Sequence, residues 1–115
     1  MARRRFRVEW AEVAVHDLEE IVAFLALDSQ QDSQQDSQRM LRRIEDRAAT
    51  LESNPARGRV VPELARFQMR TWRELVVRPY RLVYRIEADT VTVLAVFDAR
   101  RDLEDLLLER LLRSP

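Results

Sequence analysis

The sequence contains no cysteine and no lysine, and it has only one glycine and one histidine. The absence of cysteine excludes disulfide bonds and thiolate metal sites, and a lone His16 provides no cluster with metal-ligand spacing. We therefore expect neither a metal nor another cofactor. No apolar run approaches the roughly 18 residues of a membrane span, and the basic N-terminus has no apolar stretch like that of a signal peptide. These absences favour a cytoplasmic protein without a membrane partner.

The length and composition predict one domain that spans residues 1–115. A chain of 115 residues with 46% hydrophobic content is long enough to bury a single stable core without disulfide bonds or a structural metal ion. Its formal net charge is zero, but the charge is unevenly distributed. Residues 39–85 carry twelve arginines and five acidic residues, whereas the segments before and after them are acidic. The basic middle segment predicts an acidic partner.

All 20 basic residues are arginines. Arginine makes planar, bidentate contacts to carboxylates and phosphates, so this usage suits an anion-binding surface. Codon bias in a GC-rich genome produces the same usage, and this alternative stays open.

The first half of the chain predicts a strand and a helical hairpin. Residues 5–10 alternate apolar and polar side chains, as in a half-buried strand. From Ala11 the apolar residues recur at steps of three and four, which indicates a helix. This helix has no arginine, so its outer face should attract a basic partner or a basic segment of its own chain. A second helix follows and continues to Leu51.

The segment between these helices contains the repeat DSQQDSQQDSQ at residues 28–38. Its composition is compatible with a disordered loop, whereas its four-residue period is close to one helical turn and its Ser/Asp spacing resembles a capping box. We favour a helical hairpin with its corner in residues 28–33.

The second half predicts a three-stranded antiparallel meander followed by a short helix. The strands are expected at residues 69–77, 80–87 and 90–98, and their short polar connections exclude parallel neighbours. A leucine-rich helix begins after Asp102, and its surplus leucines are either covered by the sheet or exposed as a docking surface. The predicted fold class is α+β. The N-terminal strand and the meander form one sheet, and the helical hairpin and a short C-terminal helix complete the domain.

Arginines lie within and just beyond the predicted strands. Strand alternation puts Arg81 and Arg85 on the face opposite Tyr80, Leu82 and Tyr84, where we expect them to project into solvent. Neighbours on this face would be Arg73 or Glu74, with Arg100 and Arg101 at the far end. Such a surface can bind phosphate or another anion, although pairing of the arginines with Glu74 or Glu87 is the commoner arrangement.

The order and spacing of several motifs resemble the RelE/ParE superfamily of toxins from type II toxin–antitoxin operons. These motifs are GRVVPEL (residues 58–64), WREL (72–75), PYRLVY (79–84) and VLAVFDARRDL (93–103). They are most similar to the ParE-type branch. The resemblance spans nearly the entire chain, although the repeat at residues 28–38 is about one unit longer than is usual for the family.

The resemblance implies two alternative activities. ParE-like members poison DNA gyrase, whereas RelE-like members cut messenger RNA on the ribosome. If the protein is a nuclease, Arg81, Arg101 and Glu74 are its catalytic candidates, but Leu106 and Leu107 stand where nucleases tend to place a tyrosine or histidine. An arginine is a poor proton carrier because its pKa stays above about 12. We therefore expect a toxin that acts by binding and is not an enzyme.

The resemblance also implies a partner. A cognate antitoxin encoded beside the toxin should wrap around it and form a hetero-oligomer with it, and the basic segment predicts an acidic tail in that antitoxin. The expected target-binding residues are Arg73, Arg81, Arg85, Arg100 and Arg101. A third possibility is a module that binds nucleic acid without affecting growth.

Overall fold

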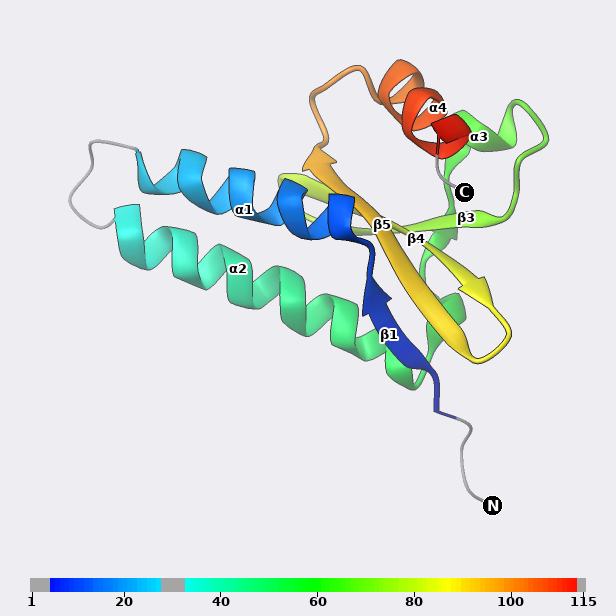
Figure 1. Ribbon diagram of the computed structural model, residues 1–115, viewed down its shortest axis with the longest axis horizontal. Helices are drawn as coiled ribbons and strands as arrows, with labels where there is room; N and C mark the ends of the chain where they lie inside the picture. The colour runs from blue at the N-terminus through cyan, green and yellow to red at the C-terminus, as the bar shows by residue number, and fades with distance from the viewer. Residues whose placement is uncertain (1–4, 28–32, 114–115) are drawn as a thin grey trace.

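The protein forms a five-stranded sheet with helices on both faces (Figure 1). This computed structural model describes residues 5–27 and 33–113. The strands are β1 (Arg7–Trp10), β2 (Arg59–Val60), β3 (Trp72–Val77), β4 (Tyr80–Glu87) and β5 (Thr90–Asp98). The helices are α1 (Glu12–Ala26), α2 (Ser33–Ala49), α3 (Pro62–Ala65) and α4 (Leu103–Arg113), and the short turns η1 (Thr50–Glu52) and η2 (Pro55–Arg57) follow α2.

The sheet has the order β1-β5-β4-β3-β2. β1 pairs parallel with β5, while β2, β3, β4 and β5 form antiparallel pairs. The predicted α+β class and the antiparallel meander are thus confirmed. β4 and β5 match the predicted limits, and β3 starts three residues later than expected, at Trp72.

The helical hairpin of α1 and α2 covers one face of the sheet. Buried side chains on the helices, such as Leu18 and Ile44, pack against Leu82 and Tyr84 of β4. The alternation in β4 predicted this arrangement. α2 begins at Ser33, so residues 33–38 of the repeat are helical as expected. The predicted corner at residues 28–33 otherwise lies outside the described residues.

The opposite face of the sheet is also covered, which corrects the expectation of an open arginine face. Leu64 of α3 and Leu103 of α4 pack on Trp72, Val83 and other buried residues of the strands. Figure 1 shows α3 and α4 together on the side of the sheet away from the hairpin. Some of the leucines of α4 are therefore covered by the sheet, since Leu106 and Leu108 also pack against this cluster.

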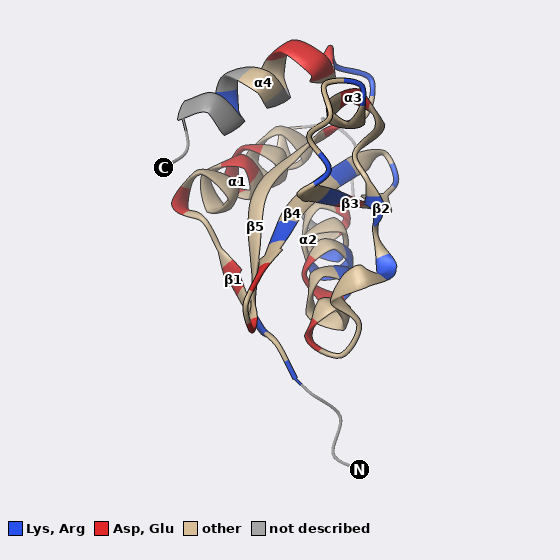
Figure 2. Ribbon diagram, turned by 90° about the vertical axis from the view of Figure 1, so that its right-hand side faces the viewer, with Lys and Arg blue, Asp and Glu red and all other residues tan. Residues whose placement is uncertain are grey.

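The charged residues follow the division expected from the sequence. Acidic residues lie along α1, while arginines lie on α2 and on the adjacent edge of the sheet (Figure 2). Within the chain, Arg110 of α4 binds Asp17 of α1, whose side chain is largely buried, whereas the acidic residues Glu12, Glu19 and Glu20 of this helix are exposed. None of the helices in the described residues is long and apolar enough to cross a membrane.

Candidate functional site

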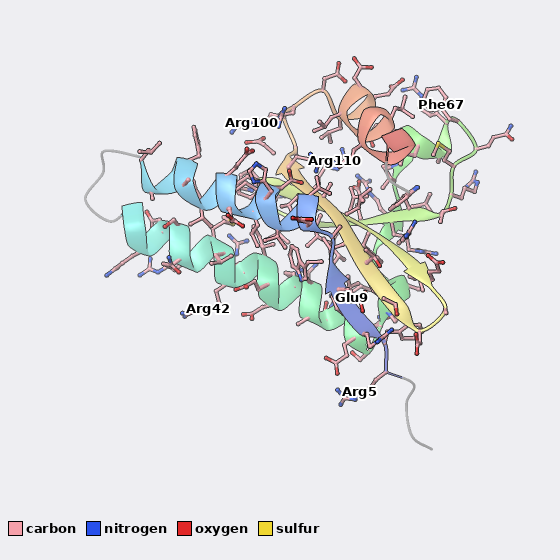
Figure 3. The ribbon with its side chains drawn as sticks, in the orientation of Figure 1. Arg5, Glu9, Arg42, Phe67, Arg100 and Arg110 are labelled. Carbon is pink, nitrogen blue, oxygen red and sulfur yellow. The ribbon has the colours of Figure 1, made fainter. Side chains whose placement is uncertain are left out.

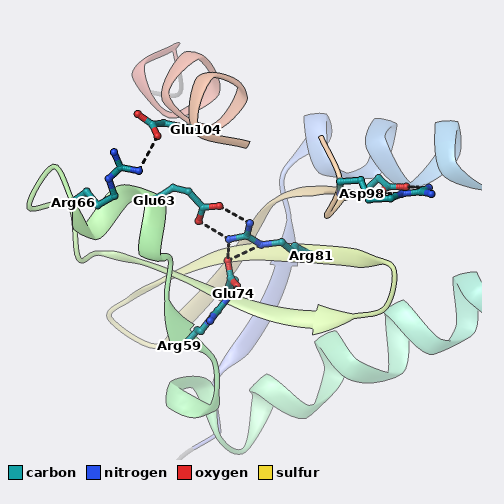
Figure 4. Close-up of polar contacts among 8 residues, drawn as sticks. Arg59, Glu63, Arg66, Glu74, Arg81, Asp98 and Glu104 are labelled. Atoms are coloured by element: carbon teal, nitrogen blue, oxygen red, sulfur yellow. Dashed lines mark hydrogen bonds and ion pairs between the residues drawn. The ribbon is translucent and has the colours of Figure 1, made fainter. Parts of the chain in front are cut away.

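Four charged residues from three motifs meet in one network between α3 and the sheet (Figure 4). Arg81 donates to both carboxylate oxygens of Glu63, from Nη1 to Oε2 at 2.7 Å and from Nη2 to Oε1 at 2.8 Å. Its Nε donates to Oε1 of Glu74 at 2.9 Å, and its Nη2 also contacts this oxygen. Oε2 of Glu74 accepts from Nε of Arg59 at 2.9 Å. We call these four residues the arginine–glutamate network.

The network pairs two arginines with two glutamates, and two of its members, Glu74 and Arg81, are buried. The side chain of Glu74 is 0% exposed and that of Arg81 is 8% exposed. The hydrogen bond from Arg81 lowers the pKa of Glu63 despite the opposing effect of burial. The pKa of Arg81 is raised, chiefly by its hydrogen bond to Glu63. The hydrogen bond from Arg81 therefore favours the anionic form of Glu63, and removal of Arg81 would leave the buried carboxylate of Glu74 without one of its two arginine partners.

The expectation that Arg81 projects into solvent is wrong. Alternation placed it on the correct face of the sheet, but α3 covers that face and supplies Glu63. The alternative pairing with Glu74 is confirmed. Glu74 is fully buried and both of its oxygens accept hydrogen bonds from arginines, so this carboxylate is not open to a substrate as a general base must be.

A second contact between motifs lies beside the network. The backbone N–H of Gly58 donates to the Tyr84 hydroxyl at 3.0 Å, and this hydroxyl donates to the carbonyl oxygen of Pro55 at 2.6 Å. Burial raises the pKa of Tyr84, which keeps it a neutral donor. The motif residues that carry the resemblance therefore build the interior, where they join β2, β3, β4 and α3.

Arg73 lies on the face of the sheet opposite Arg81, so it does not join the expected arginine surface. Its Nη1 donates to the carbonyl oxygens of Gly58 at 2.7 Å and Ala56 at 3.4 Å. These bonds hold the segment that leads into β2. Alternation explains the placement, since Arg73 shares a face with Leu75, which packs on the hairpin.

Arg85 is partly exposed and lies in a groove beside α1. Its guanidinium carbon lies 5.5 Å from the centre of the Trp72 ring, a cation–π contact. Its Nη2 is 3.5 Å from Glu87, and its Nε is buried without a hydrogen-bond partner. His16 lines the same groove, which we call the His16–Arg85 groove.

Arg100 and Arg101 are exposed at the end of β5, as expected. Arg100 binds both oxygens of Asp98, with Nε to Oδ1 at 2.9 Å and Nη2 to Oδ2 at 2.6 Å. These hydrogen bonds lower the pKa of Asp98 to about 2. Among the described residues, Arg101 forms no ion pair. Arg101 is therefore more available than Arg100 to pair with an anion of another molecule.

A second groove lies between α1 and the end of β5, with Arg100 and Arg101 on its rim. We call it the α1–β5 groove. Its apolar lining includes Ile21, Phe24, Leu25, Tyr80, Val96 and Phe97. Sequence reasoning assigned the apolar residues of α1 to a core-facing stripe and so missed this groove. The exposed Phe24 is visible only once α1 is placed relative to the sheet.

The described residues contain no group of three or more histidine, cysteine, aspartate or glutamate side chains that could hold a metal ion. The chemistry that they offer consists of anion binding by the exposed arginines and apolar contact along α1. The five expected target-binding arginines do not form one surface. Arg81 and Arg73 lie within the fold, Arg85 lies in one groove, and Arg100 and Arg101 lie on the rim of another.

Comparison with known proteins settles the family. The family model described as ParE toxin of the type II toxin–antitoxin system parDE matches residues 8–103. This chain belongs to the ParE toxin family. The match covers all the motifs that suggested the resemblance, from β1 to the start of α4, and its range includes the four residues of the arginine–glutamate network. No curated protein sequence matches this ParE family member.

Solved structures share the ParE fold at low sequence identity. The chromosomal ParDE toxin–antitoxin system from P. aeruginosa is 15% identical, with a TM-score of 0.67 over 83% of this chain and 97% of that chain. The RelBE2 toxin–antitoxin complex from Mycobacterium tuberculosis is 21% identical, with a TM-score of 0.59 over 84% and 94%. A mutant of the E. coli toxin RelE in the free state is 15% identical, with a TM-score of 0.62 over 96% and 99%.

Proposed function

We propose that this ParE family member inhibits growth by binding a target such as DNA gyrase in the cytoplasm, and that a cognate antitoxin neutralises it. The observation that carries this proposal is the state of Glu74. It was the one candidate base of the chain, yet it is fully buried and bound by two arginines. The family match over residues 8–103 supports the toxin assignment.

The exposed arginines suit binding better than proton transfer. A guanidinium remains protonated at any physiological pH, so it stabilises negative charge but does not act as a general acid or base. Arg100 has an 82% exposed side chain, and Arg101 is exposed beside it. We assign these two residues to target binding. Arg81 and Arg73 instead stabilise the fold through hydrogen bonds to other residues of the chain.

A supercoiling assay tests the gyrase assignment. Purified protein should inhibit DNA supercoiling by purified gyrase, and a variant carrying both Arg100→Gln and Arg101→Gln should inhibit at least tenfold less, because an interfacial arginine commonly contributes that much to binding. The matched control is Arg42→Gln on the outer face of α2, which should inhibit like the unchanged protein. Supercoiling that proceeds normally at saturating protein would reject gyrase as the target.

A second candidate function is ribosome-dependent cleavage of messenger RNA. The observation in its favour is that His16 and Arg85 line one groove, which combines a side chain able to carry protons with a fixed cation. Primer extension on translated messages after induction would show breaks within codons. His16→Ala should abolish these breaks, whereas Glu45→Ala, an exposed residue of α2 outside this groove, should not. Intact messages during growth arrest would exclude this function.

We propose an antitoxin partner with an acidic segment. The similar structures from P. aeruginosa and M. tuberculosis are those of toxin–antitoxin systems, and the basic segment of this chain lies on α2 and the adjacent sheet edge. Induction of this gene alone should arrest growth, and induction together with the adjacent gene should restore it. Arrest that persists with the adjacent gene would reject that gene product as the antitoxin.

A further inference from the structure

The loop that joins α3 to β3 carries an exposed aromatic side chain, Phe67, which is 48% exposed (Figure 3). The backbone N–H of Met69 donates to the carbonyl oxygen of Leu64 at 3.0 Å, and that of Gln68 donates to the carbonyl oxygen of Ala65 at 3.0 Å. These two bonds form a Schellman motif, in which Gln68 has a left-handed φ of 62°. Met69 packs on the buried cluster that contains Leu64. The motif therefore fixes the loop and leaves Phe67 on the surface.

The segment that contains this loop is rich in arginine. Residues 57–70 include four arginines and a single acidic residue, Glu63. Glu63 is bound by Arg81 from the neighbouring β4, so it does not compensate the arginines of the segment. All four arginines are exposed, and they are Arg57, Arg59, Arg66 and Arg70.

Two of these four arginines already have an acidic partner. Arg59 binds the buried Glu74, and Arg66 binds Glu104 in the acidic first turn of α4. The side chains of Arg59 and Arg66 nevertheless remain 64% and 69% exposed. The other two arginines form no ion pair with any described residue. They are therefore available to an anion of another molecule.

The arginines follow the outer edge of the sheet. β2 is the last strand of the sheet, and Arg59 of β2 lies opposite Glu74 of β3. Arg70 precedes Glu74 by four residues, which span at most about 14 Å of extended chain. Figure 2 shows this edge on the side of the molecule that faces the viewer. A linear polyanion that lies along the edge can therefore contact several of these arginines and the Phe67 loop.

The composition of this surface fits a single-stranded nucleic acid better than a protein. Among the described residues, Phe67 is the one large apolar side chain of residues 57–70 that is exposed. A protein interface has a core of several apolar side chains, whereas an unpaired base stacks on one aromatic ring while arginines bind the phosphates beside it. Bases in a duplex already stack on their neighbours, so the ring selects a single strand.

We propose that residues 57–70 bind single-stranded nucleic acid, with an unpaired base stacked on Phe67 and the adjacent phosphates bound by the exposed arginines. The planar guanidinium suits this role because it donates two parallel hydrogen bonds to one phosphate. The site is separate from Arg100 and Arg101, which we assign to the protein target. The supercoiling test of that target therefore keeps its outcome whether or not nucleic acid binds here.

Fluorescence anisotropy with the full-length protein tests the site. The probes are a labelled single-stranded RNA and a labelled single-stranded DNA of about 12 nucleotides and the same sequence, and the DNA in duplex form. Phe67→Ser should weaken binding to the single strands by about fivefold or more, because a stacked base contributes this much, and should leave duplex binding unchanged. The single strand that binds more tightly identifies RNA or DNA as the preferred ligand, and either order supports the proposal.

The salt dependence separates the arginines from the aromatic ring. Each phosphate contact to a single strand contributes about 0.7 to the slope of log Kd against log salt concentration. Arg57→Gln and Arg70→Gln should therefore each lower this slope by about 0.7, whereas Phe67→Ser should lower the affinity without changing the slope. Neither arginine has an ion pair among the described residues, so these substitutions spare the fold.

Three variants serve as controls. Phe24→Ser removes another exposed aromatic side chain, and Arg42→Gln removes another exposed arginine. Phe67→Trp retains an aromatic ring at the proposed stacking position. All three should bind the single strands with a Kd within about twofold of that of the unchanged protein. Thermal unfolding of each variant separates loss of contact from loss of fold.

Three results would overturn the proposal. The first is the absence of binding to either single strand at 0.05 M NaCl. The second is an equal Kd for Phe67→Ser and the unchanged protein. The third is displacement of the labelled strand by polyglutamate as efficiently as by the unlabelled strand, which would assign the arginines to acidic protein segments.

Discussion

Gly58 illustrates at the scale of one residue why a motif position tolerates little change. Its φ of −78° and ψ of 156° are open to any residue, so its conformation does not require glycine. The surroundings of Gly58 require a glycine, since a Cβ atom would lie 2.5 Å from the backbone oxygen of Glu74 and 2.5 Å from the Tyr84 hydroxyl. The close approach of two segments, rather than a turn, explains the glycine.

Gly58→Ala should therefore lower the free energy of unfolding by roughly 1–3 kcal/mol through overpacking. Urea denaturation followed by circular dichroism measures the change. In a background of Tyr84→Phe the cost of Gly58→Ala should be smaller, because the hydroxyl is gone and only the Glu74 oxygen and a ring carbon of residue 84, at 2.9 Å, remain close. An equal cost in both backgrounds would show that the hydroxyl does not contribute to the effect.

Arg81 provides the second residue-scale prediction. Arg81→Leu leaves the buried carboxylate of Glu74 with Arg59 alone and should lower the free energy of unfolding by about 3–5 kcal/mol. The control is Arg78→Leu, an exposed arginine next to the same strand, for which we expect a change within about 0.5 kcal/mol. Equal unfolding curves for the two variants would contradict the structural role of the network.

The pH dependence of stability should report on Glu63. Arg81 lowers the pKa of Glu63 in the folded protein relative to its ordinary value of 4.5. The resulting stabilisation is present above pH 4.5 and is lost as the pH falls through the lowered pKa. In Glu63→Gln this loss should be absent, so its free energy of unfolding should decline less below pH 4.5. Parallel declines in both proteins, measured by urea denaturation at several pH values, would contradict this assignment.

At the scale of elements, Asp17 joins three parts of the fold. Its Oδ2 accepts the backbone N–H of Val96 on β5, beyond the last residue that pairs with β1, and it also binds Arg110 of α4. The side chain thus satisfies a backbone donor of β5 at a position that β1 does not reach. It also attaches α4 to the hairpin side of the molecule.

Asp17→Ala should lower the free energy of unfolding by roughly 1–3 kcal/mol, because a buried donor and a cation lose their acceptor. Glu19→Ala on the same helix is the matched control, since Glu19 is exposed and its change should stay within about 0.5 kcal/mol. Hydrogen exchange at the Val96 amide gives a local readout. Unchanged protection of this amide in Asp17→Ala would refute the role of the side chain.

The sequence predicted the larger elements better than the small ones. The first and last residues of β4 and β5 were predicted correctly, because side chains alternate over many residues in these strands and the turns that bound them are short. α3 was missed because its four residues, Pro62–Ala65, make about one turn and show no helical period. That one turn carries Glu63, so missing it also concealed the burial of Arg81. The network depends on residues that meet only in the folded chain.

At the scale of the whole molecule, the charge division predicts salt-sensitive association. A partner with an acidic segment should be attracted to the arginines of α2 and the adjacent sheet edge, and this attraction weakens as ionic strength rises. The Kd for the product of the adjacent gene should increase by at least about tenfold between 0.05 and 0.5 M NaCl. A Kd that stays constant over this range would mean that apolar contacts alone sustain the complex.

The interior position of the arginine–glutamate network has a consequence for comparing toxins of this family. Sequence relatives that keep these charged motif residues share a scaffold, and selection can preserve that scaffold while the exterior diverges. Two proteins with the same motifs can therefore bind and inhibit different cellular targets. The residues that determine target specificity should be sought at exposed positions such as Phe24, Arg100 and Arg101, where substitution leaves the scaffold intact.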